Sequence, residues 1–400
     1  MGIGDTLRRA VVLGTARSGQ AAAALLEQHG VEVVRADRSL GNDGDTGLLE
    51  GVDVLVKSPG VPRDNALVVA AEKRSMPIWS EVELGFRLLP NPILGVTGTN
   101  GKTTTTEWLG AMFRAAGRDV AVAGNVGAAL TGVRAPADSW IVCELSSFQL
   151  EDIHEFRPRV AVLLNLEPDH LDRHGSFEAY RDAKLRIFEN QHDEDTAIVP
   201  RGFGPILGAA ARLEFGQDDE LPAEPSLPGS HNRENAVAAT VAARAAGIPD
   251  AAIAETLRTF PGVAHRLELV TELDGVRFVN DSKATNTAAA RRALAAYDAP
   301  VHVILGGSRK GESFDELAGD VRGRAYLIGE TAEELADALG RGGVPYVVCG
   351  DLATAVAAAA GAARSGEIVL LSPACASYDQ FRDFEQRGEE FRRLVQNLSG

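Results

Sequence analysis

The sequence predicts an α/β protein of three domains, with mostly parallel sheets that are covered by helices. Three observations lead to this fold class. Short apolar strands alternate with helical patterns along the chain, which is the pattern of parallel sheets. A glycine-rich loop at residues 95–106 joins an apolar strand to a helix. The length of 400 residues exceeds what one hydrophobic core usually holds.

The first domain, residues 1–91, is predicted to be Rossmann-like. Its expected elements are a strand at 10–14, a helix at 20–27 and strands at 31–35 and 52–56. The first turn has Ala16 where a dinucleotide fingerprint needs glycine, so support for NAD is weak, although Asp37 lies about where a ribose-binding acid would stand. Ser58-Pro-Gly60 supplies small residues at a strand end, where open α/β sheets bind ligands.

The second domain, residues 92–262, is predicted to resemble a P-loop ATPase, and the third, residues 263–400, to be Rossmann-like. Prolines on both sides of Asn91 mark the first boundary. The second domain is expected to contain strands at 119–123, 140–143 and 160–164, a Pro-rich loop at 221–228 and a helix at 236–246. The third is expected to contain strands at 276–280, 301–305, 326–328, 346–348 and 368–371.

Charge and composition exclude several classes of protein. The net charge of -16 argues against a nucleic-acid partner, because duplex binding relies on cations that neutralise phosphates. The sequence has no apolar run long enough for a transmembrane helix and no recognisable signal peptide. Its three cysteines are odd in number and far apart, which argues against a disulfide framework. We therefore expect a cytoplasmic protein without membrane insertion.

The stretch GVTGTNGKTTTT, residues 95–106, is the most informative in the chain. Backbone N–H groups in such a loop and at the following helix N-terminus face an anion, and the helix dipole favours negative charge. Lys102 is expected to reach the β- and γ-phosphates of a nucleotide, and the Thr103 hydroxyl to hold Mg²⁺. The common pattern has glycine where Val96 stands, and here Gly98 lies nearer the lysine. A tight strand–helix turn without a ligand is the simpler alternative.

Acidic and histidine residues follow two more strands of this domain. Glu144 ends the strand at 140–143 and is placed to bind Mg²⁺ directly or through water. Asp169, His170 and Asp172 crowd the end of the strand at 160–164, which indicates a metal or phosphate site. The alternatives are a surface acid and a hydrogen-bonded histidine.

Lys184 lies in a helical pattern just after this acidic cluster. A surface lysine in a salt bridge is the ordinary interpretation. Only six of the 40 cationic residues are lysines, however, so arginine carries most of the positive charge. A buried lysine amine with a lowered pKa can react as a nucleophile, including with CO₂ to make a carbamate. Such a carbamate would be one more oxygen ligand for Mg²⁺.

Asn235 ends a polar stretch that is expected to precede the helix at 236–246. His or Asn side chains at a helix start are often caps, and recognition of a base by an amide is the other interpretation. Near the start of the third domain, Arg266 is positioned for a phosphate.

Three strands of the third domain end in small or polar residues. The loops that follow them are 281–286 with Lys283, 306–311 with Lys310, and 372–381 with Ser377. Because the carboxyl ends of parallel strands meet at one edge of a sheet, these loops predict a pocket for a small anion. A carboxylate substrate fits such a pocket.

In this order, and over essentially the whole chain, the motifs resemble those of the Mur ligases, a family that includes folylpolyglutamate synthase relatives. The matching residues are TGTNGKTTTT, Glu144, Asp169-His170, Lys184, His231-Asn232, His265-Arg266 and NDSKATN. The strings ELSSFQL, NDSKATN and SPACASYDQFRDFEQRGEEF resemble the branch that adds D-glutamate to UDP-N-acetylmuramoyl-L-alanine.

The resemblance implies an ATP-dependent amide ligase of peptidoglycan precursor synthesis, with two Mg²⁺ sites and a carbamylated Lys184. The implied catalytic residues are Lys102, His170 and Lys184, and the implied metal ligands are Thr103, Glu144, His170 and Lys184. ATP would be held by Gly98, Thr99, Asn100, Gly101, Lys102, Thr103, Thr104, Thr105, Asn235, Arg266 and Asp281. The UDP-substrate would be held by Ser18, Asp37, Arg38, Gly60, Asn125, Ser146, Gln149 and Tyr180. D-Glutamate would be held by Lys283, Thr285, Lys310, Ser377, Tyr378 and Phe384.

The chain departs from the family pattern in its first domain, where Arg17 precedes Ser18 and Arg38-Ser39 follows Asp37. These departures leave the uridine contacts the least certain. The alternatives are another amino-acid ligase of the group, a folate-type ligase, and a P-loop NTPase switch. Residues 1–91 form a full α/β segment, which argues against folate, and a switch has no need of Lys310 or Ser377. We expect a monomer whose partners are small molecules.

Overall fold

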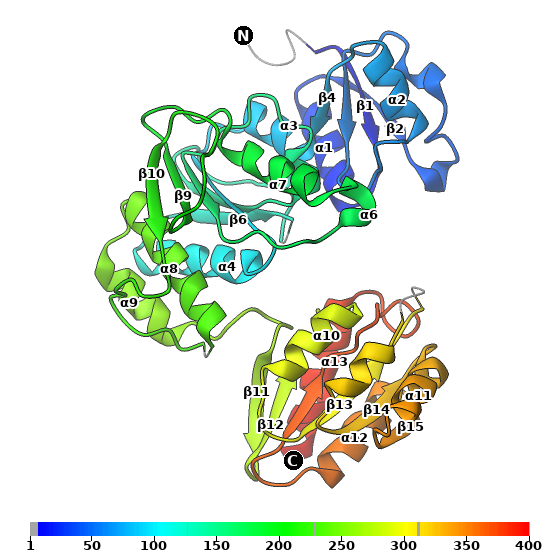
Figure 1. Cartoon of the computed structure of the whole chain (residues 1–400). Coiled ribbons are helices and arrows are strands. Elements are labelled where there is room, and N and C mark those ends of the chain that lie inside the picture. Colours follow the sequence, from blue (N-terminus) through cyan, green and yellow to red (C-terminus); the bar gives the residue numbers. More distant parts are fainter. Residues whose placement is uncertain (1–6, 126, 228, 310–312, 400) are drawn as a thin grey trace. The chain divides into compact units, whose positions relative to one another are not determined.

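The computed structural model describes residues 7–399 except 126, 228 and 310–312. Within this range the chain forms three sheets. It divides into two compact units, Met1–Phe260 and Pro261–Gly400, of which the first holds two sheets and the second holds one (Figure 1). The division between the units falls close to the boundary predicted between residues 262 and 263.

The first sheet has four parallel strands in the order β2-β1-β3-β4. Its strands are β1 (Arg9–Leu13), β2 (Glu32–Ala36), β3 (Val54–Lys57) and β4 (Ile78–Ser80). Its helices are α1 (Arg17–Gln28), α2 (Ala66–Lys73) and α3 (Glu81–Leu88), with short 3-10 turns at Arg38–Leu40 and Thr46–Leu49. Along β1, Ala10 and Val12 pack into one core and Val11 and Leu13 into another. Both faces of this sheet are therefore buried, as expected for parallel strands.

The second sheet has six parallel strands in the order β10-β9-β8-β5-β7-β6. They are β5 (Ile93–Thr97), β6 (Val120–Gly124), β7 (Trp140–Glu144), β8 (Val160–Leu163), β9 (Thr196–Pro200) and β10 (Ala211–Phe215). The helices are α4 (Lys102–Ala115), α5 (Ser147–Leu150), α6 (Leu171–His174), α7 (Phe177–Leu185), α8 (Ser230–Ala245) and α9 (Asp250–Thr259), with 3-10 turns at Leu130–Gly132 and Arg186–Phe188. Strand β5, which leads into the phosphate loop, lies between β7 and β8.

The third sheet has the order β11-β12-β16-β13-β14-β15, and only the pairing of β11 with β12 is antiparallel. Its strands are β11 (Glu268–Leu273), β12 (Val276–Asn280), β13 (Val301–Gly306), β14 (Gly323–Ile328), β15 (Tyr346–Gly350) and β16 (Ile368–Leu371). The helices are α10 (Thr287–Ala295), α11 (Ala332–Arg341), α12 (Leu352–Ala362) and α13 (Phe384–Gln396), with 3-10 turns at Asp315–Gly319 and Asn397–Ser399.

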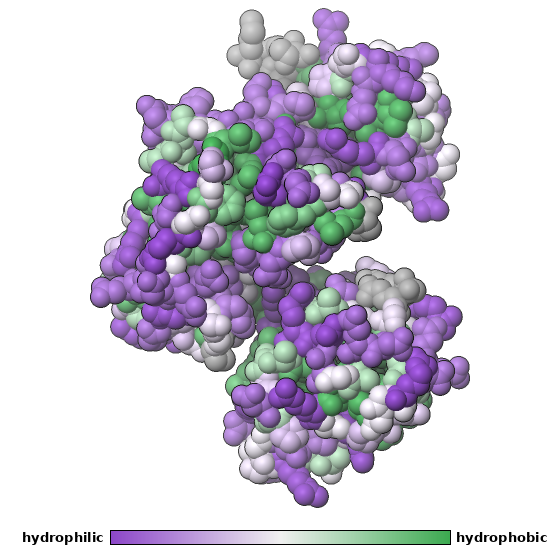
Figure 2. All heavy atoms as spheres, viewed as in Figure 1, coloured by the Kyte–Doolittle hydropathy of each residue, from purple (hydrophilic) through white to green (hydrophobic). Residues whose placement is uncertain are grey.

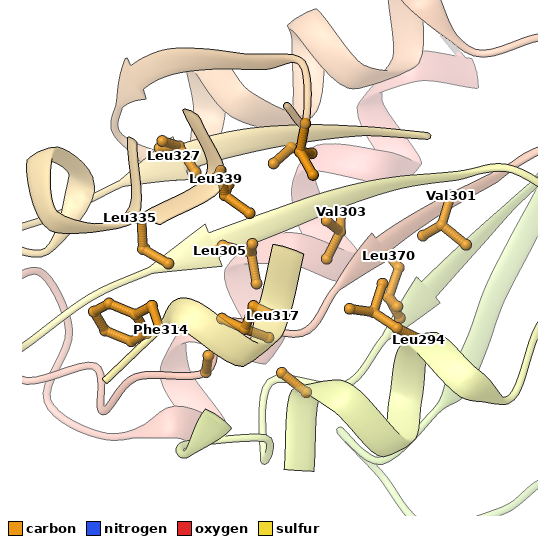
Figure 3. Close-up of a cluster of buried hydrophobic side chains, with 14 of the residues drawn as sticks. Leu294, Val301, Val303, Leu305, Phe314, Leu317, Leu327, Leu335, Leu339 and Leu370 are labelled. Carbon is orange, nitrogen blue, oxygen red and sulfur yellow. The ribbon is translucent and has the colours of Figure 1, made fainter. Parts of the chain in front are cut away.

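Apolar side chains of the third sheet alternate between two cores. On β13, Val303 and Leu305 face the core that includes Leu294 of α10 and Leu335 of α11 (Figure 3). Ile304, between them, packs into the core that contains α12 and α13 residues. The sheet is thus covered on both faces, and its ligand-binding options are confined to its edges and strand ends.

The α/β fold with mostly parallel sheets is confirmed, and the predicted strands are found with small shifts at their ends. One local prediction is wrong. Residues 230–235 do not precede a helix, because α8 already begins at Ser230 and its N-cap is Gly229, which supplies no side-chain cap. The side chains from His231 to Asn235 therefore project from the first turns of a helix.

The surface is mainly polar in the view of Figure 2, with hydrophobic residues in smaller areas. Among the helices that the structure describes, none combines the length and the apolar character needed to cross a membrane.

Candidate active site

The phosphate loop connects β5 to α4 through residues 98–101. Gly101 is the N-cap of α4 and has a positive φ of 80°, a conformation that favours glycine. A Cβ at this position would lie 2.1 Å from Asn235 Oδ1, so a side chain is excluded for a second reason. Val96 is a fully buried residue of β5 rather than part of the loop. The departure from the common glycine pattern therefore falls in the strand and leaves the loop itself intact.

The Lys102 ammonium lies against the main-chain carbonyls of this loop. Its Nζ donates hydrogen bonds to the carbonyl oxygens of Gly98, at 2.9 Å, and Thr99, at 2.8 Å. Thr103, Thr104 and Thr105, in the first turn of α4, are buried. Lysine charge, helix N-terminus and loop N–H groups are thus gathered at one strand end, as an anion site requires.

Asn165, just beyond β8, holds the loop in shape. Its Oδ1 accepts hydrogen bonds from the N–H groups of Thr99, at 3.1 Å, and Asn100, at 2.8 Å. Its Nδ2 donates to Asn100 O at 3.2 Å. No role was predicted for Asn165 from the sequence. Its position could have indicated one, because it is the first polar side chain after β8, the strand that neighbours β5.

Glu144 ends β7, on the other side of β5, and is buried. Its Oε1 accepts a hydrogen bond from Asn125 Nδ2 at 2.9 Å. Its Oε2 is buried without a hydrogen-bond partner in the described part of the chain. Because an unpaired buried carboxylate oxygen is costly, this atom suits a cation.

Lys184 lies on α7 with only 2% of its surface exposed. Its Nζ donates a 2.8 Å hydrogen bond to Gly98 O in the phosphate loop and stands 4.8 Å from the ring centre of Tyr180. Burial, followed by the charge of Lys102, lowers the pKa of Lys184 to about 7. A substantial fraction of this amine is therefore neutral at physiological pH, as a nucleophilic amine must be.

His170 and Asp169 lie near the same edge but are half-exposed, with 3.6 Å between His170 Nε2 and Asp169 Oδ2. His174 is far better enclosed, between Ser147 Oγ at 3.0 Å and Glu151 Oε1 at 3.2 Å, and it stacks on the Phe148 ring. In the part of the chain that the structure describes, no group of three or more His, Cys, Asp or Glu side chains is arranged to hold a metal ion.

The residues expected on the UDP-substrate side fall at several strand ends of the first unit. Ser18 lies on α1, Arg38 is exposed after β2, and Gly60 follows β3. Asp37 accepts hydrogen bonds from Thr15 N at 2.6 Å, and from Ser39 N and Oγ at 2.8 and 2.6 Å. The Ser39 hydroxyl bond and these N–H bonds hold the pKa of Asp37 well below its usual range. Asp37 thereby stabilises the turn after β1.

Four more of these residues contact one another, Glu144 or the phosphate loop. Ser146 and Gln149 form a capping box at the start of α5. Asn125 pairs with Glu144, and the Tyr180 hydroxyl lies 2.9 Å from Thr99 Oγ1. Burial raises the pKa of Tyr180 to about 12, so its hydroxyl stays protonated.

The second unit gathers the remaining predicted residues around the carboxyl ends of β12, β16 and β13, which are adjacent strands. Asp281 accepts hydrogen bonds from Ser372 Oγ at 2.8 Å and Leu267 N at 3.2 Å, and burial raises its pKa to about 6. The Lys283 N–H donates to His265 O at 3.0 Å. Ser377 is buried, Thr285 and Arg266 are partly buried, and Tyr378 is 74% exposed. Phe384 begins α13 with its ring edge to His265, and Lys310 lies outside the described residues.

Two protein-family models match the parts of the chain that contain these sites. Residues 96–202 match the Mur ligase middle domain, and residues 265–375 match the Mur ligase glutamate ligase domain. Among solved structures, UDP-N-acetylmuramate-alanine ligase MurC from Thermotoga maritima aligns over 98% of this chain and 100% of its own, with a TM-score of 0.60 and 18% identity. A MurF structure from Acinetobacter baumannii aligns with a TM-score of 0.55 and 17% identity, over 88% of this chain and 92% of its own. At these identities the structural matches show a shared fold.

Closer relatives define the family more narrowly. A protein of Acidobacterium capsulatum is 41% identical over 97% of this chain and 96% of its own length. One of Pelotomaculum thermopropionicum is 41% identical over 98% of both chains. The chain therefore belongs to the Mur ligase family. Both of these relatives carry the name UDP-N-acetylmuramoylalanine--D-glutamate ligase.

Proposed function

We infer that this chain is the ligase that joins D-glutamate to UDP-N-acetylmuramoyl-L-alanine at the expense of ATP, in cytoplasmic peptidoglycan precursor synthesis. Full-length similarity to enzymes of that name carries the inference, because it extends over 97% and 98% of this chain. ATP phosphorylates the substrate carboxylate to an acyl phosphate and leaves as ADP. The amine of D-glutamate then attacks the acyl carbon, loses a proton, and expels inorganic phosphate as the amide forms.

The phosphate-loop edge is the proposed place of the first step. Lys102 and the N–H groups at the start of α4 bind the β- and γ-phosphates of ATP, while Asn165 accepts from the Thr99 and Asn100 N–H groups and keeps the loop in its binding shape. Bound Mg²⁺ would supply positive charge that neutralises the phosphates. The orphaned Oε2 of Glu144 and the Thr103 hydroxyl fit one such ion. Asn235, whose amide lies against Gly101, and Arg266 and Asp281 of the second unit complete the proposed ATP contacts.

A second Mg²⁺ site is proposed at His170 and a carbamylated Lys184. The neutral amine of Lys184 attacks CO₂, so that an N–C bond forms and one proton is released. The carbamate carries a negative charge at a buried position where the protonated lysine would carry a positive charge. The lowered pKa of Lys184 supports this step, because the amine need not first be deprotonated at high pH.

The substrate contacts are proposed from the family pattern. The UDP-sugar side comprises Ser18, Asp37, Arg38, Gly60, Asn125, Ser146, Gln149 and Tyr180. The D-glutamate side comprises Lys283, Thr285, Lys310, Ser377, Tyr378 and Phe384. We assign UDP-substrate binding to domain 1–91, with Asn125, Ser146, Gln149 and Tyr180 contributed by domain 92–262. D-Glutamate binding is assigned to domain 263–400 and ATP binding mainly to domain 92–262, in a protein that works as a monomer.

The test is phosphate release from ATP with Mg²⁺ and UDP-N-acetylmuramoyl-L-alanine, with and without D-glutamate. Release that requires both substrates, with L-glutamate inactive, supports the proposal. Release that ignores D-glutamate overturns it. Activity with a different amino acid or with a folate would identify another ligase of the group, and hydrolysis without either substrate would indicate a nucleotide switch.

A further inference from the structure

Arg387 is the largest buried cation in the second unit, with 1% of its surface exposed. It lies on α13, where Arg387, Phe391 and Val395 follow one another at intervals of four and are all buried. An arginine thus occupies a position on the apolar stripe of the helix, where an aliphatic residue would be expected. Burial lowers the pKa of Arg387 to about 10, so the side chain remains charged at neutral pH.

The guanidinium group contacts two of the three strand-end loops through hydrogen bonds. Its Nε donates to Ser282 Oγ at 3.0 Å, and its NH2 group donates to Ser282 O at 2.8 Å, in the loop after β12. The NH2 group also donates to Cys375 O at 3.1 Å, and NH1 donates to Ala376 O at 3.2 Å, in the loop after β16. One planar side chain therefore fixes the separation of these two loops.

The third loop, after β13, rests against the same group. A Cβ on Gly307 would lie 3.2 Å from Arg387 NH1 and 2.1 Å from Ala376 O. The N–H of the next residue, Ser308, donates to Ala376 O at 2.9 Å. The carbonyl of Ala376 thus links Arg387 to the loop after β13, and all three loops meet at one guanidinium.

We propose that Arg387 is a positioning residue for the amino-acid substrate, because it holds together the three strand-end loops that carry Lys283, Ser377 and Ser308. It acts through these loops and does not itself touch the substrate. The proposal rests on the proposed function and deepens it by naming what shapes the D-glutamate pocket. The atoms that accept hydrogen bonds from the Arg387 guanidinium are a hydroxyl and main-chain carbonyls, none of which carries a full negative charge. The positive charge of Arg387 is therefore not neutralised by these partners and also favours a carboxylate nearby.

The ATP contacts of the second unit have separate supports. Asp281 is held by Ser372 Oγ and by Leu267 N, neither of which bonds to Arg387. Loss of the guanidinium should therefore affect the D-glutamate pocket more than the nucleotide contacts. This difference separates a positioning role from a general contribution to folding.

The experiment measures KM for each substrate in the wild type and in R387M, which keeps an unbranched apolar side chain of similar reach. The expected result is a rise of about tenfold or more in KM for D-glutamate, with KM for ATP and for the UDP-substrate within about twofold. R387K keeps the charge but offers three donors on one nitrogen. Its KM for D-glutamate should therefore lie between those of the wild type and R387M. V395A, on the same buried stripe, is the control, and we expect it to lower Tm without changing KM for D-glutamate.

Two results would overturn the proposal: a fall in Tm with every KM unchanged, or equal rises in all three KM values. If R387M does not fold, S282A removes the hydroxyl that accepts from Arg387 Nε and donates to Phe384 O at 2.8 Å. An unchanged KM for D-glutamate in both S282A and R387K then counts against the proposal. Failure of the wild type to release phosphate in response to D-glutamate would contradict the proposed function instead.

Discussion

The carboxyl edges of the second and third sheets are both candidate ligand sites, but they are built differently. At the second sheet, the phosphate loop, Asn165 and Glu144 come from three adjacent strands, and each lies within a few residues of its strand end. At the third sheet, three strand-end loops depend on Arg387 from a helix that follows all of them. At the first edge the strand order brings these three features together, and Lys184 of α7 adds one hydrogen bond to the loop. At the second edge the three loops are linked by a side chain from a later helix.

The two edges also differ in how they hold positive charge. Lys184 contacts a single loop carbonyl and has a pKa of about 7, so its charge is easily lost. Arg387 makes four hydrogen bonds and keeps its proton at neutral pH. The proposed roles match these properties: a reactive amine for Lys184, and a permanently charged planar group with several donors for Arg387.

The largest effect is expected from Lys102. K102M removes the cation that faces the ATP phosphates, and kcat should fall by about 100-fold to 1000-fold. Phosphate release with both substrates is the measurement. K102R should not restore activity, because a planar guanidinium cannot replace a compact amine in the loop. Full activity in K102R would show that only charge matters at this position.

A smaller effect is expected from Glu144. E144Q keeps the hydrogen-bond partner of Asn125 but removes the carboxylate charge, so the Mg²⁺ concentration for half-maximal activity should rise by about tenfold or more. A magnesium titration measures this shift. E178Q, an exposed acid on α7, is the matched control. An unchanged titration in E144Q would remove Glu144 from the proposed metal site.

Lys184 should make folding stability depend on pH. Its folded-state pKa is about 7 against an ordinary value of 10.5, so between these pH values the unfolded chain binds more protons than the folded one. The free energy of unfolding contributed by this group therefore rises as pH increases from about 7 toward 10.5, and levels off below 7. Urea unfolding of wild type and K184M in CO₂-free buffer measures the difference. Parallel pH profiles for the two proteins would contradict the burial of a titrating amine.

The smallest effect is expected from Asn165, which acts on the loop rather than on the nucleotide. N165A removes the side-chain acceptor of the Asn100 N–H, while the Thr99 N–H keeps the main-chain carbonyl of Asn165 at 3.1 Å. It should raise KM for ATP by about tenfold or less. N165D keeps the acceptor oxygens but places a negative charge near the phosphates, so its KM for ATP should rise further. An unchanged KM for ATP in N165A would indicate that the Asn165 side chain contributes little to the shape of the loop.

Most of the fold was predictable because most strands are short apolar runs between turn residues. Strand β4 has three residues, and β10 and β11 carry charged side chains at the edges of their sheets, so they lack such a run and were not predicted. Strand β9 was also not predicted, although it holds a buried apolar run of three residues between Thr196 and Pro200. The phosphate loop and Glu144 were recognisable because local sequence determines them. Arg387 was not, since its role depends on contacts with residues about 105 positions earlier in the chain.

The central claim is that the phosphate-loop edge forms the acyl phosphate and the third-sheet edge supplies the amino acid. Positional isotope exchange in ¹⁸O-labelled ATP, with UDP-N-acetylmuramoyl-L-alanine but no D-glutamate, tests it most directly. We predict exchange in the wild type and in R387M, and loss of exchange in K102M. Loss of exchange in R387M to the same degree as in K102M would contradict the separation of the two edges.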